Sequence, residues 1–325
     1  MTRGTVLTGA GGVWRVRTAN GDTVKASLRG RLKKGDSGRR ADGSMRRDTV
    51  DTADRTVKLA VGDEVTLERD ERDDVWAIGQ ILPRRSRLAR RAPGGGRGER
   101  VVAANVDQVV VVFAAANPEP HPRMLDRFLV IAEGNDLPAR VVINKVELIG
   151  TDEARRRFAD YETAGYPVSY TSVTARIGLD DLRNALGGRT SVLTGPSGVG
   201  KSSLMNSLYP GLDLRVGEIS ESVNKGRHTT VGGYAHPLPD ADGGFVVDTP
   251  GLREVGLWSL PPRDLDRCFP EFRPLIPQCR FADCHHGSEP DCAVRAAVDE
   301  GTISRARYDS FRKLRAELED AADLW

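Results

Sequence analysis

A glycine-rich stretch, Gly195–Ser202, constrains the fold more than any other part of this sequence. It fits the pattern G-x-x-x-x-G-K-[ST], and it lies between a predicted strand, Ser191–Thr194, and a predicted helix, Ser203–Tyr209. In this setting the glycines let backbone N–H groups surround a phosphate, and the start of the helix adds favourable partial charge. The sequence therefore predicts an α/β nucleotide-binding domain. Its predicted phosphate-binding residues are Gly195, Pro196, Ser197, Gly198, Val199, Gly200, Lys201, Ser202 and Ser203.

Strand and helix patterns alternate around this stretch, over residues 101–258. Val109–Ala116 is a continuous apolar run, typical of a strand that is buried on both faces. Helical spacing follows at Arg123–Glu133, and a second buried strand is predicted at Ala139–Asn144. This alternation predicts a doubly wound domain with a parallel sheet.

Two short motifs indicate which base is bound. Asn144, Lys145 and Glu147 lie at the carboxyl end of a predicted strand and resemble the guanine-reading NKxD motif of GTPases. In that motif a carboxylate accepts hydrogen bonds from two guanine N–H groups, which adenine lacks. This chain has Glu in place of Asp, which keeps the charge on an arm one methylene longer. Thr171 and Ser172 follow another strand and resemble the loop that contacts guanine O6, so an ATPase or kinase is disfavoured.

The predicted magnesium ligands come from three places in the sequence. Ser202 and Asp248 follow predicted strands, and Asp248–Gly251 resembles the DxxG motif of GTPases, in which the Gly251 N–H senses the γ-phosphate. The polar stretch Gly226–Thr230 lies where the first switch belongs, and one of Thr229 and Thr230 is expected to bind Mg²⁺. Lys201 is predicted to reach the β- and γ-phosphates.

The order of these motifs is unusual. GTPases ordinarily run from the phosphate loop through the switch threonine and DxxG to NKxD. Here Glu147 and Thr171 precede the phosphate loop, which is followed by Thr230 and Asp248. The sequence therefore predicts a circularly permuted GTPase domain over residues 101–258, with both switches next to the C-terminal segment.

Residues 1–83 have the pattern of a small barrel. Short alternating segments are separated by turn signals, and four or five strands in about 80 residues suit an OB-fold. Residues 1–100 hold 23 basic against 14 acidic residues, whereas residues 101–325 hold 25 against 32. This asymmetry indicates a polyanion as partner.

Residues 84–100 carry seven arginines, one glutamate, one proline and four glycines. The composition predicts a linker between the barrel and the nucleotide-binding domain. The segment is expected to be either a solvated tether or a basic arm that follows phosphates.

The C-terminal segment, residues 259–325, contains a metal-binding pattern. Cys279, Cys284, His286 and Cys292 supply three thiolates and one imidazole, which suits a closed tetrahedral Zn²⁺ site. His285 is adjacent and is the alternative ligand to His286. A helix is predicted at roughly Ile303–Asp323, so this segment is expected to be a zinc-binding domain that ends in a helix.

Composition excludes several classes of protein. The longest apolar run has eight residues, far short of the roughly 20 that a membrane helix needs. The N-terminus has no apolar signal-peptide core, and four cysteines do not form a disulfide framework. We expect a cytoplasmic protein without a membrane partner.

Taken together, these features resemble the RsgA (YjeQ) family of small ribosomal subunit biogenesis GTPases. The resemblance rests on the basic barrel, the permuted motif order, GPSGVGKSS, GRHTT, DTPG and the cysteine–histidine spacing. It implies a GTP/GDP-binding enzyme with Mg²⁺ and one structural Zn²⁺. It also implies GTP hydrolysis that the small subunit stimulates during late assembly, with 16S rRNA contacted by the barrel and the zinc domain. We expect a monomer with no DNA partner.

Ras-like enzymes use a Gln after DxxG to orient the attacking water, and Leu252 occupies that position here. His228 resembles the His of the family's GRHTT motif and is the candidate that positions water; contact with RNA or capping of the loop is the equal alternative. The rival function is a GTP-binding RNA scaffold or checkpoint protein with little turnover.

Overall fold

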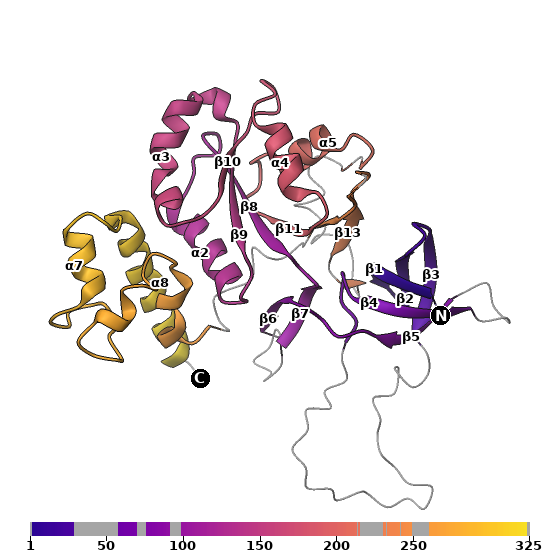
Figure 1. Ribbon diagram of the computed structural model, residues 1–325, viewed down its shortest axis with the longest axis horizontal. Helices are drawn as coiled ribbons and strands as arrows, with labels where there is room; N and C mark the ends of the chain where they lie inside the picture. The colour runs from indigo at the N-terminus through magenta and orange to yellow at the C-terminus, as the bar shows by residue number, and fades with distance from the viewer. Residues whose placement is uncertain are drawn as a thin grey trace, which may run out of the picture.

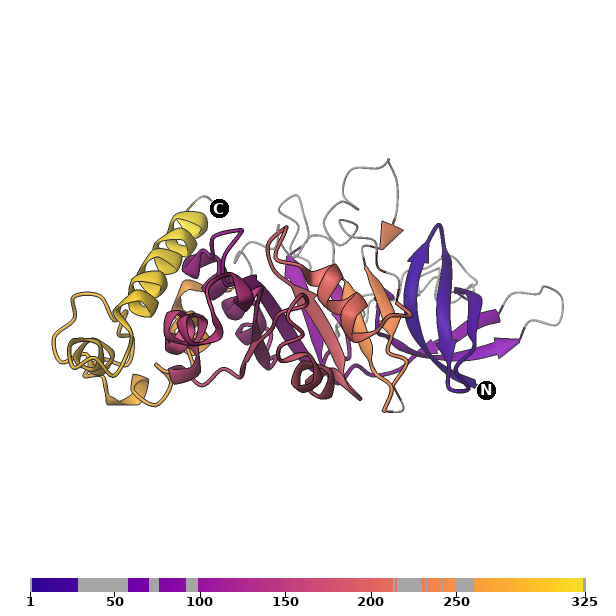
Figure 2. The same ribbon diagram turned by 90° about the horizontal axis from the view of Figure 1, so that it is seen from above.

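The computed structural model describes residues 2–28, 58–69, 76–91, 99–212, 214, 230–231, 233–240, 242–248 and 260–323. Figure 1 shows a barrel of strands at one end, a central sheet covered by helices, and a helical C-terminal part at the other end. These three parts lie in a row in the second view (Figure 2). None of the helices in these residues is long and apolar enough to cross a membrane.

Five strands form the N-terminal barrel: β1 (Thr2–Ala10), β2 (Val13–Thr18), β3 (Thr23–Leu28), β4 (Glu64–Arg69) and β5 (Trp76–Ile81). They pair in the order β1-β2-β3-β5-β4, and β4 pairs back onto β1, which closes the sheet. Alternate side chains point inward, so that Val6, Val16 and Ile78 are fully buried. The small barrel of four or five strands that the sequence predicts is confirmed, with five strands among the described residues.

The structure differs from the linker expected over residues 84–100. Strands β6 (Arg87–Arg91) and β7 (Glu99–Ala104) form an antiparallel hairpin in this region. Leu88 is buried in the core of the central domain, and the Ala89 N–H donates to Asn135 Oδ1 at 3.0 Å. A buried leucine and a backbone hydrogen bond therefore anchor a segment whose composition is dominated by arginine.

The central sheet has the strand order β10-β9-β8-β11-β14-β13. Its strands are β8 (Gln108–Ala114), β9 (Ala139–Asn144), β10 (Val168–Tyr170), β11 (Thr190–Thr194), β13 (Tyr234–Pro237) and β14 (Phe245–Asp248). All neighbours are parallel except β13, which runs antiparallel to β14. The mainly parallel sheet that the sequence predicts is confirmed.

Helices cover both faces of this sheet. On one face, α2 (Pro122–Glu133) and α3 (Thr151–Thr163) share a core with Val109 and Val111 of β8. On the other, α4 (Leu179–Leu186) and α5 (Lys201–Leu208) share a core with Val110 and Val112. Because successive residues of a strand face opposite sides, the continuous apolar run of β8 serves both cores.

The C-terminal part contains α7 (Ala293–Asp299) and α8 (Arg305–Asp323), preceded by the short 3₁₀ turns η3 (Pro262–Asp264), η4 (Asp266–Cys268) and η5 (Ile276–Gln278). Phe269, Phe272 and Phe311 form an aromatic cluster with ring centroids 5.1–5.4 Å apart. Tyr308 and Leu314 of the predicted last helix are buried here. This core is continuous with that of α2 and α3, so the C-terminal part is docked on the central domain.

Candidate nucleotide and metal sites

The predicted nucleotide-binding motifs converge on one edge of the central sheet. The glycine-rich loop follows β11, Asn144 ends β9, Thr171 follows β10 and Asp248 ends β14. These four strands are parallel, so their carboxyl ends meet at the same edge, where ligands of open α/β sheets bind. The structure therefore brings together segments that lie about 100 residues apart in the chain.

The phosphate loop depends on glycine at two positions. A Cβ atom at Gly195 would lie 2.0 Å from the carbonyl oxygen of Val112, and one at Gly200 would lie 2.6 Å from Asn144 Nδ2. Gly200 also has φ +93°, a conformation that side chains rarely adopt. Lys201 is the first residue of α5, and its Nζ donates to the carbonyl oxygens of Gly195 at 2.9 Å and Pro196 at 2.7 Å. These bonds hold the ammonium inside the loop, where a phosphate would bind.

The loop that carries the predicted base-recognition residues is tied directly to the phosphate loop. Asn144 Nδ2 donates to Val199 O at 2.9 Å, and Lys145 Nζ donates to Gly198 O at 2.7 Å. Lys145 Nζ also donates to Asn117 O at 2.5 Å. Asn117 follows β8 at the same edge of the sheet and was not among the predicted site residues. Its position after a predicted buried strand was the signal that could have found it.

Thr171 and Ser172 complete this loop pair from the end of β10. Thr171 Oγ1 donates to Asn144 Oδ1 at 3.1 Å, and both Thr171 and Ser172 are fully buried. The Val146 N–H donates to Thr171 O at 3.2 Å. The two loops therefore form one hydrogen-bonded unit, as the resemblance to guanine-binding loops requires.

Glu147 is exposed at the surface of this pair of loops. Partial burial raises its pKa, but hydrogen bonds from Ser172 and Thr174 and the charge of Lys145 outweigh that effect, so the pKa lies below its ordinary value. The carboxylate is therefore ionised at neutral pH. That is the state required of an acceptor for two N–H donors.

The switch motifs are only partly within the described residues. Asp248 is in register with Leu193 of β11, which places it beside the strand that leads into the phosphate loop. Thr230 begins a short strand, β12 (Thr230–Val231), whose backbone pairs with Ala10 of the barrel strand β1. His228, Thr229, Gly251 and Leu252 lie outside the described residues.

The four predicted metal ligands are gathered into one cluster. One ligand atom from each of Cys279, Cys284, His286 and Cys292 lies within 4.8 Å of all the others. His286 Nδ1 is 3.3 Å from Cys292 Sγ and 3.6 Å from Cys279 Sγ, and those two sulfurs are 3.9 Å apart. Tetrahedral Zn²⁺ would hold sulfurs about 3.7 Å apart, given Zn–S bonds of about 2.3 Å. The cluster is therefore compatible with zinc.

The surroundings of His286 identify it rather than His285 as the member of this cluster. His286 is fully buried, whereas His285 is exposed. Its second ring nitrogen, Nε2, lies 3.4 Å from Asp266 Oδ2, and its carbonyl accepts a 2.6 Å hydrogen bond from Tyr308 Oη. Asp266 and Tyr308 were not predicted, because neither lies in the metal-binding pattern.

Burial raises the pKa of Cys284 to about 12, so its thiolate needs a cation nearby.

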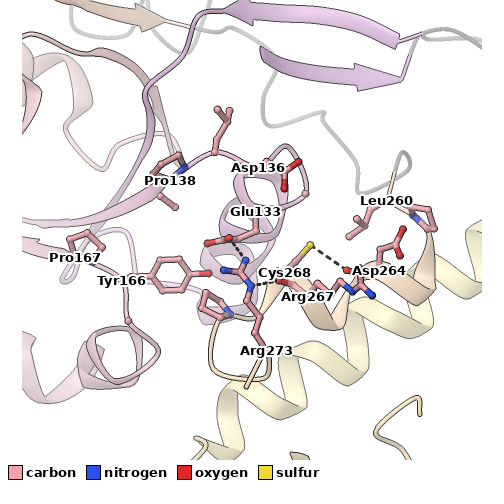
Figure 3. A pocket seen from close by; sticks show the side chains of 16 residues that line it. Glu133, Asp136, Pro138, Tyr166, Pro167, Leu260, Asp264, Arg267, Cys268 and Arg273 are labelled. Carbon is pink, nitrogen blue, oxygen red and sulfur yellow. Dashed lines mark hydrogen bonds and ion pairs between the residues drawn. The ribbon is translucent and has the colours of Figure 1, made fainter. Parts of the chain in front are cut away.

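A cavity of about 850 Å³ lies where the C-terminal part meets the central domain (Figure 3). Glu133 and Arg273 form an ion pair within it, and Tyr166 points toward them. Pro138 and Ala139, at the start of β9, also line it. The cavity is therefore at the amino edge of the sheet, opposite the phosphate loop, and is not the predicted nucleotide site.

The fold and the site together define a P-loop nucleotide-binding domain whose chain is circularly permuted, because β9 and β10, which carry the predicted base-recognition motifs, precede the phosphate-loop strand β11. The family model of the RsgA GTPase matches residues 81–258. The chain belongs to the RsgA GTPase family.

Individual relatives agree with this assignment. A small ribosomal subunit biogenesis GTPase RsgA from Gemmatimonas aurantiaca is 57% identical over 318 residues, which are 98% of this chain and 97% of the relative. One from Agathobacter rectalis is 38% identical over 265 residues, 81% of this chain and 84% of the relative.

Two solved structures share the whole fold. YjeQ from Thermotoga maritima has a TM-score of 0.74 and 32% identity, over 98% of both chains. YloQ, described as a circularly permuted GTPase, has a TM-score of 0.70 and 26% identity, over 98% of this chain and 96% of its own. The permuted order that the motifs predict is thus shared with a solved relative.

Proposed function

We propose that this protein is a GTPase that acts in late assembly of the small ribosomal subunit. Its relatives carry the name small ribosomal subunit biogenesis GTPase. The observation that carries the proposal is the direct hydrogen bonding of Asn144 and Lys145 to the phosphate loop, which joins base recognition and phosphate binding in one site. The small subunit is the proposed partner; it stimulates GTP hydrolysis, and release from it is coupled to GTP.

The positions of the side chains support the proposed nucleotide-binding roles. The backbone of Gly195–Gly200 surrounds the phosphates, and Lys201, held inside the loop, binds their negative charge. Glu147 accepts the guanine N–H groups, while Asn144 and Thr171 hold its loop in place. Mg²⁺, when bound, neutralises charge that develops on the transferring phosphoryl group. Ser202, Asp248 and Thr230 are its proposed protein ligands.

Hydrolysis requires a group that orients water. Leu252 has no hydrogen-bonding side chain, so we assign this role to His228 and expect slow turnover by the protein alone. Gly251 is the proposed γ-phosphate sensor, and Thr229 is the alternative switch ligand to Thr230. The pairing of Thr230 with Ala10 supports a link between the barrel and the switch, because the two share backbone hydrogen bonds.

The Cys₃His cluster is the proposed structural zinc site. Four buried or half-buried ligands with no open position suit a closed site, and Asp266 would orient the imidazole so that Nδ1 faces the metal. The bound ion would keep the thiolates of Cys284 and Cys292 ionised despite their burial.

The partner surface is assigned to the barrel and the zinc domain, with 16S rRNA as ligand. The excess of basic residues in residues 1–100 supports an RNA partner. We propose a cytoplasmic monomer that does not bind DNA. Its proposed domains are 1–83, 101–258 and 259–325. Residues 84–100 connect the first two, and strand β6 in this segment pairs with β7 at the start of the central domain.

A hydrolysis assay with and without purified small subunits tests the proposal. We expect slow release of phosphate from GTP alone and a marked increase when subunits are added, with Lys201→Ala inactive in both conditions. GTP binding without turnover in either condition would instead support the RNA-scaffold alternative. His228→Ala should lower turnover without weakening GTP binding, because it removes an interaction made only in the transition state.

A further inference from the structure

Two consecutive residues of α8, Arg307 and Tyr308, bind to different domains. The guanidinium of Arg307 forms an ion pair with Asp126 of α2, in the central domain. The hydroxyl of Tyr308 donates to the carbonyl oxygen of His286, in the metal cluster, at 2.6 Å. One turn of helix therefore contacts both the cluster and the nucleotide-binding domain.

The environment of Arg307 makes its position hard to change. Its side chain is 3% exposed and that of Asp126 is 1% exposed. Its Nε and one terminal nitrogen also donate to both carboxylate oxygens of Glu271, at 2.8 and 3.1 Å. The guanidinium carbon lies 4.7 Å from the ring centroid of Phe269 and 5.3 Å from that of Tyr161. A buried cation with this many fixed partners holds one geometry, since any displacement would leave a buried charge unpaired.

The second half of the connection runs from Tyr308 to the metal ligands. His286 has φ +55°, a backbone conformation that non-glycine residues rarely adopt, and the Tyr308 hydrogen bond holds its carbonyl there. The same residue presents Nδ1 to Cys292 and Cys279. Moving Tyr308 would therefore move a metal ligand.

We infer that Arg307 is a positioning residue for the Cys₃His cluster, and that Asp126 of the GTPase domain acts through it to retain the metal. Docking of the last domain and retention of the metal are then one cooperative property rather than two separate ones. The inference goes beyond the proposed function but rests on the proposed zinc site, because it needs a metal to be bound.

The test measures zinc release from the full-length, zinc-loaded chain after mixing with an excess of a coloured chelator. Asp126→Asn keeps the shape of the side chain and removes its charge. We expect zinc release at least about tenfold faster than from the wild type, the size of effect seen when groups that support metal ligands are removed. Tyr308→Phe should give a similar increase, and the double variant should be no faster than the faster single variant.

Two control variants separate this role from general destabilisation. Arg127→Gln breaks the exposed Arg127–Glu317 ion pair between the same two helices and should leave the rate within about twofold of the wild type. Leu182→Ala removes a fully buried side chain on the opposite face of the sheet. It should lower the free energy of unfolding at least as much as Asp126→Asn without speeding zinc release.

The visible spectrum of the Co²⁺-substituted chain reports the ligand geometry itself. The absorption bands of tetrahedral Co²⁺ should weaken or shift in Asp126→Asn and Tyr308→Phe but not in Leu182→Ala. If Asp126→Asn does not fold, Arg307→Lys, which keeps the charge but cannot form the forked pairing with Glu271, allows the same comparisons.

The outcomes distinguish this inference from the zinc proposal. A wild-type chain that binds no metal would overturn both. A wild-type chain that holds one zinc, together with equal release from Asp126→Asn and Leu182→Ala, would overturn only the positioning role of Arg307.

Discussion

Arg84 and the buried Asp63 form an ion pair with two hydrogen bonds. The pair joins the start of β4 to the segment between β5 and the β6–β7 hairpin. Arg84 Nε lies 2.6 Å from Asp63 Oδ1, and one terminal nitrogen lies 2.8 Å from Oδ2. Asp63 is fully buried and also accepts the Ala60 N–H at 2.7 Å. Arg84 is therefore part of the fold, although it begins a run of arginines with the composition of an RNA-binding arm.

Two neighbouring arginines should accordingly behave differently. Arg84→Ala leaves the Asp63 carboxylate buried without its cation and should lower the free energy of unfolding by about 3 kcal/mol. Arg85 is 61% exposed and pairs with the partly exposed Asp107, so Arg85→Ala should cost less than about 0.5 kcal/mol. Urea denaturation of the two variants checks this. Equal and small losses would mean that the Arg84–Asp63 pair contributes little.

Several elements show which parts of the fold the sequence could predict and which it could not. The strand Ala139–Asn144 is predicted to the residue, because a short apolar run that begins directly after Pro138 marks it locally. The β6–β7 hairpin is missed because its arginines mask the single buried leucine. Nor does any local pattern distinguish Arg307 from the exposed arginines, since its partner Asp126 is 181 residues away.

The residues of the nucleotide and metal sites divide in the same way, into those that a local motif predicts and those that only the fold brings together. Residues within motifs of fixed spacing, such as the phosphate loop and the metal ligands, are predicted because the chemistry dictates the spacing. Asp266 and Tyr308 support the metal ligands through hydrogen bonds across the fold, and only the three-dimensional structure brings them near. Asn117 contacts Lys145 in the same way, and its place after a predicted strand is its only local signal.

Glu147 should determine the preference for guanine. Glu147→Ala removes the charged acceptor and should weaken GTP binding by about 1.5–3 kcal/mol, or about 10- to 150-fold. Glu147→Asp keeps the carboxylate and should retain selectivity for GTP over ATP. Fluorescent-nucleotide competition measures both. Glu153→Ala, a change at an exposed acid of α3, serves as control, and an unchanged GTP affinity in Glu147→Ala would place base recognition elsewhere.

Stability should depend on pH through His236. Burial in β13 lowers the pKa of this histidine from 6.5 to about 4. Between these values the unfolded chain takes up a proton that the folded chain does not, so the free energy of unfolding falls as pH falls from 6.5 to 4. The side chain is only half-buried, so we expect a loss of about 1–2 kcal/mol over this window.

Denaturation curves at several pH values measure this contribution. His236→Gln should make the fall between pH 6.5 and 4 shallower, whereas His121→Gln, at an exposed histidine, should not. Carboxylates titrate in the same range, but they contribute equally to both variants. Parallel pH profiles of the two variants would contradict a lowered pKa of His236 in the folded chain.

Loss of the metal should loosen the last domain. Cys284→Ser, or chelation of the wild type, should release one zinc per chain, because the folding free energy of a small metal site comes largely from binding. Limited proteolysis should then cut within residues 260–300, while the central domain stays resistant. Cys268→Ser is the matched control, since Cys268 is buried outside the cluster. Normal resistance of a metal-free chain would show that the apolar core alone fixes this region.

Arg15 and Lys25 carry the last prediction. They are direct partners across strands β2 and β3, and both are exposed on the outer face of the barrel. Like charges opposite each other destabilise a sheet by a few tenths of a kcal/mol, so the pair does not serve the fold. In OB-folds this pair of strands forms the nucleic-acid-binding face, and cations there act by displacing counterions from phosphates.

The double variant Arg15→Gln/Lys25→Gln should therefore bind small subunits more weakly. The slope of log affinity against log salt should fall by about one for each phosphate that the variant no longer neutralises. Its stability should stay equal to that of the wild type or rise slightly, and its GTP hydrolysis without subunits should not change. Wild-type subunit affinity at every salt concentration would show that RNA binds elsewhere on the chain.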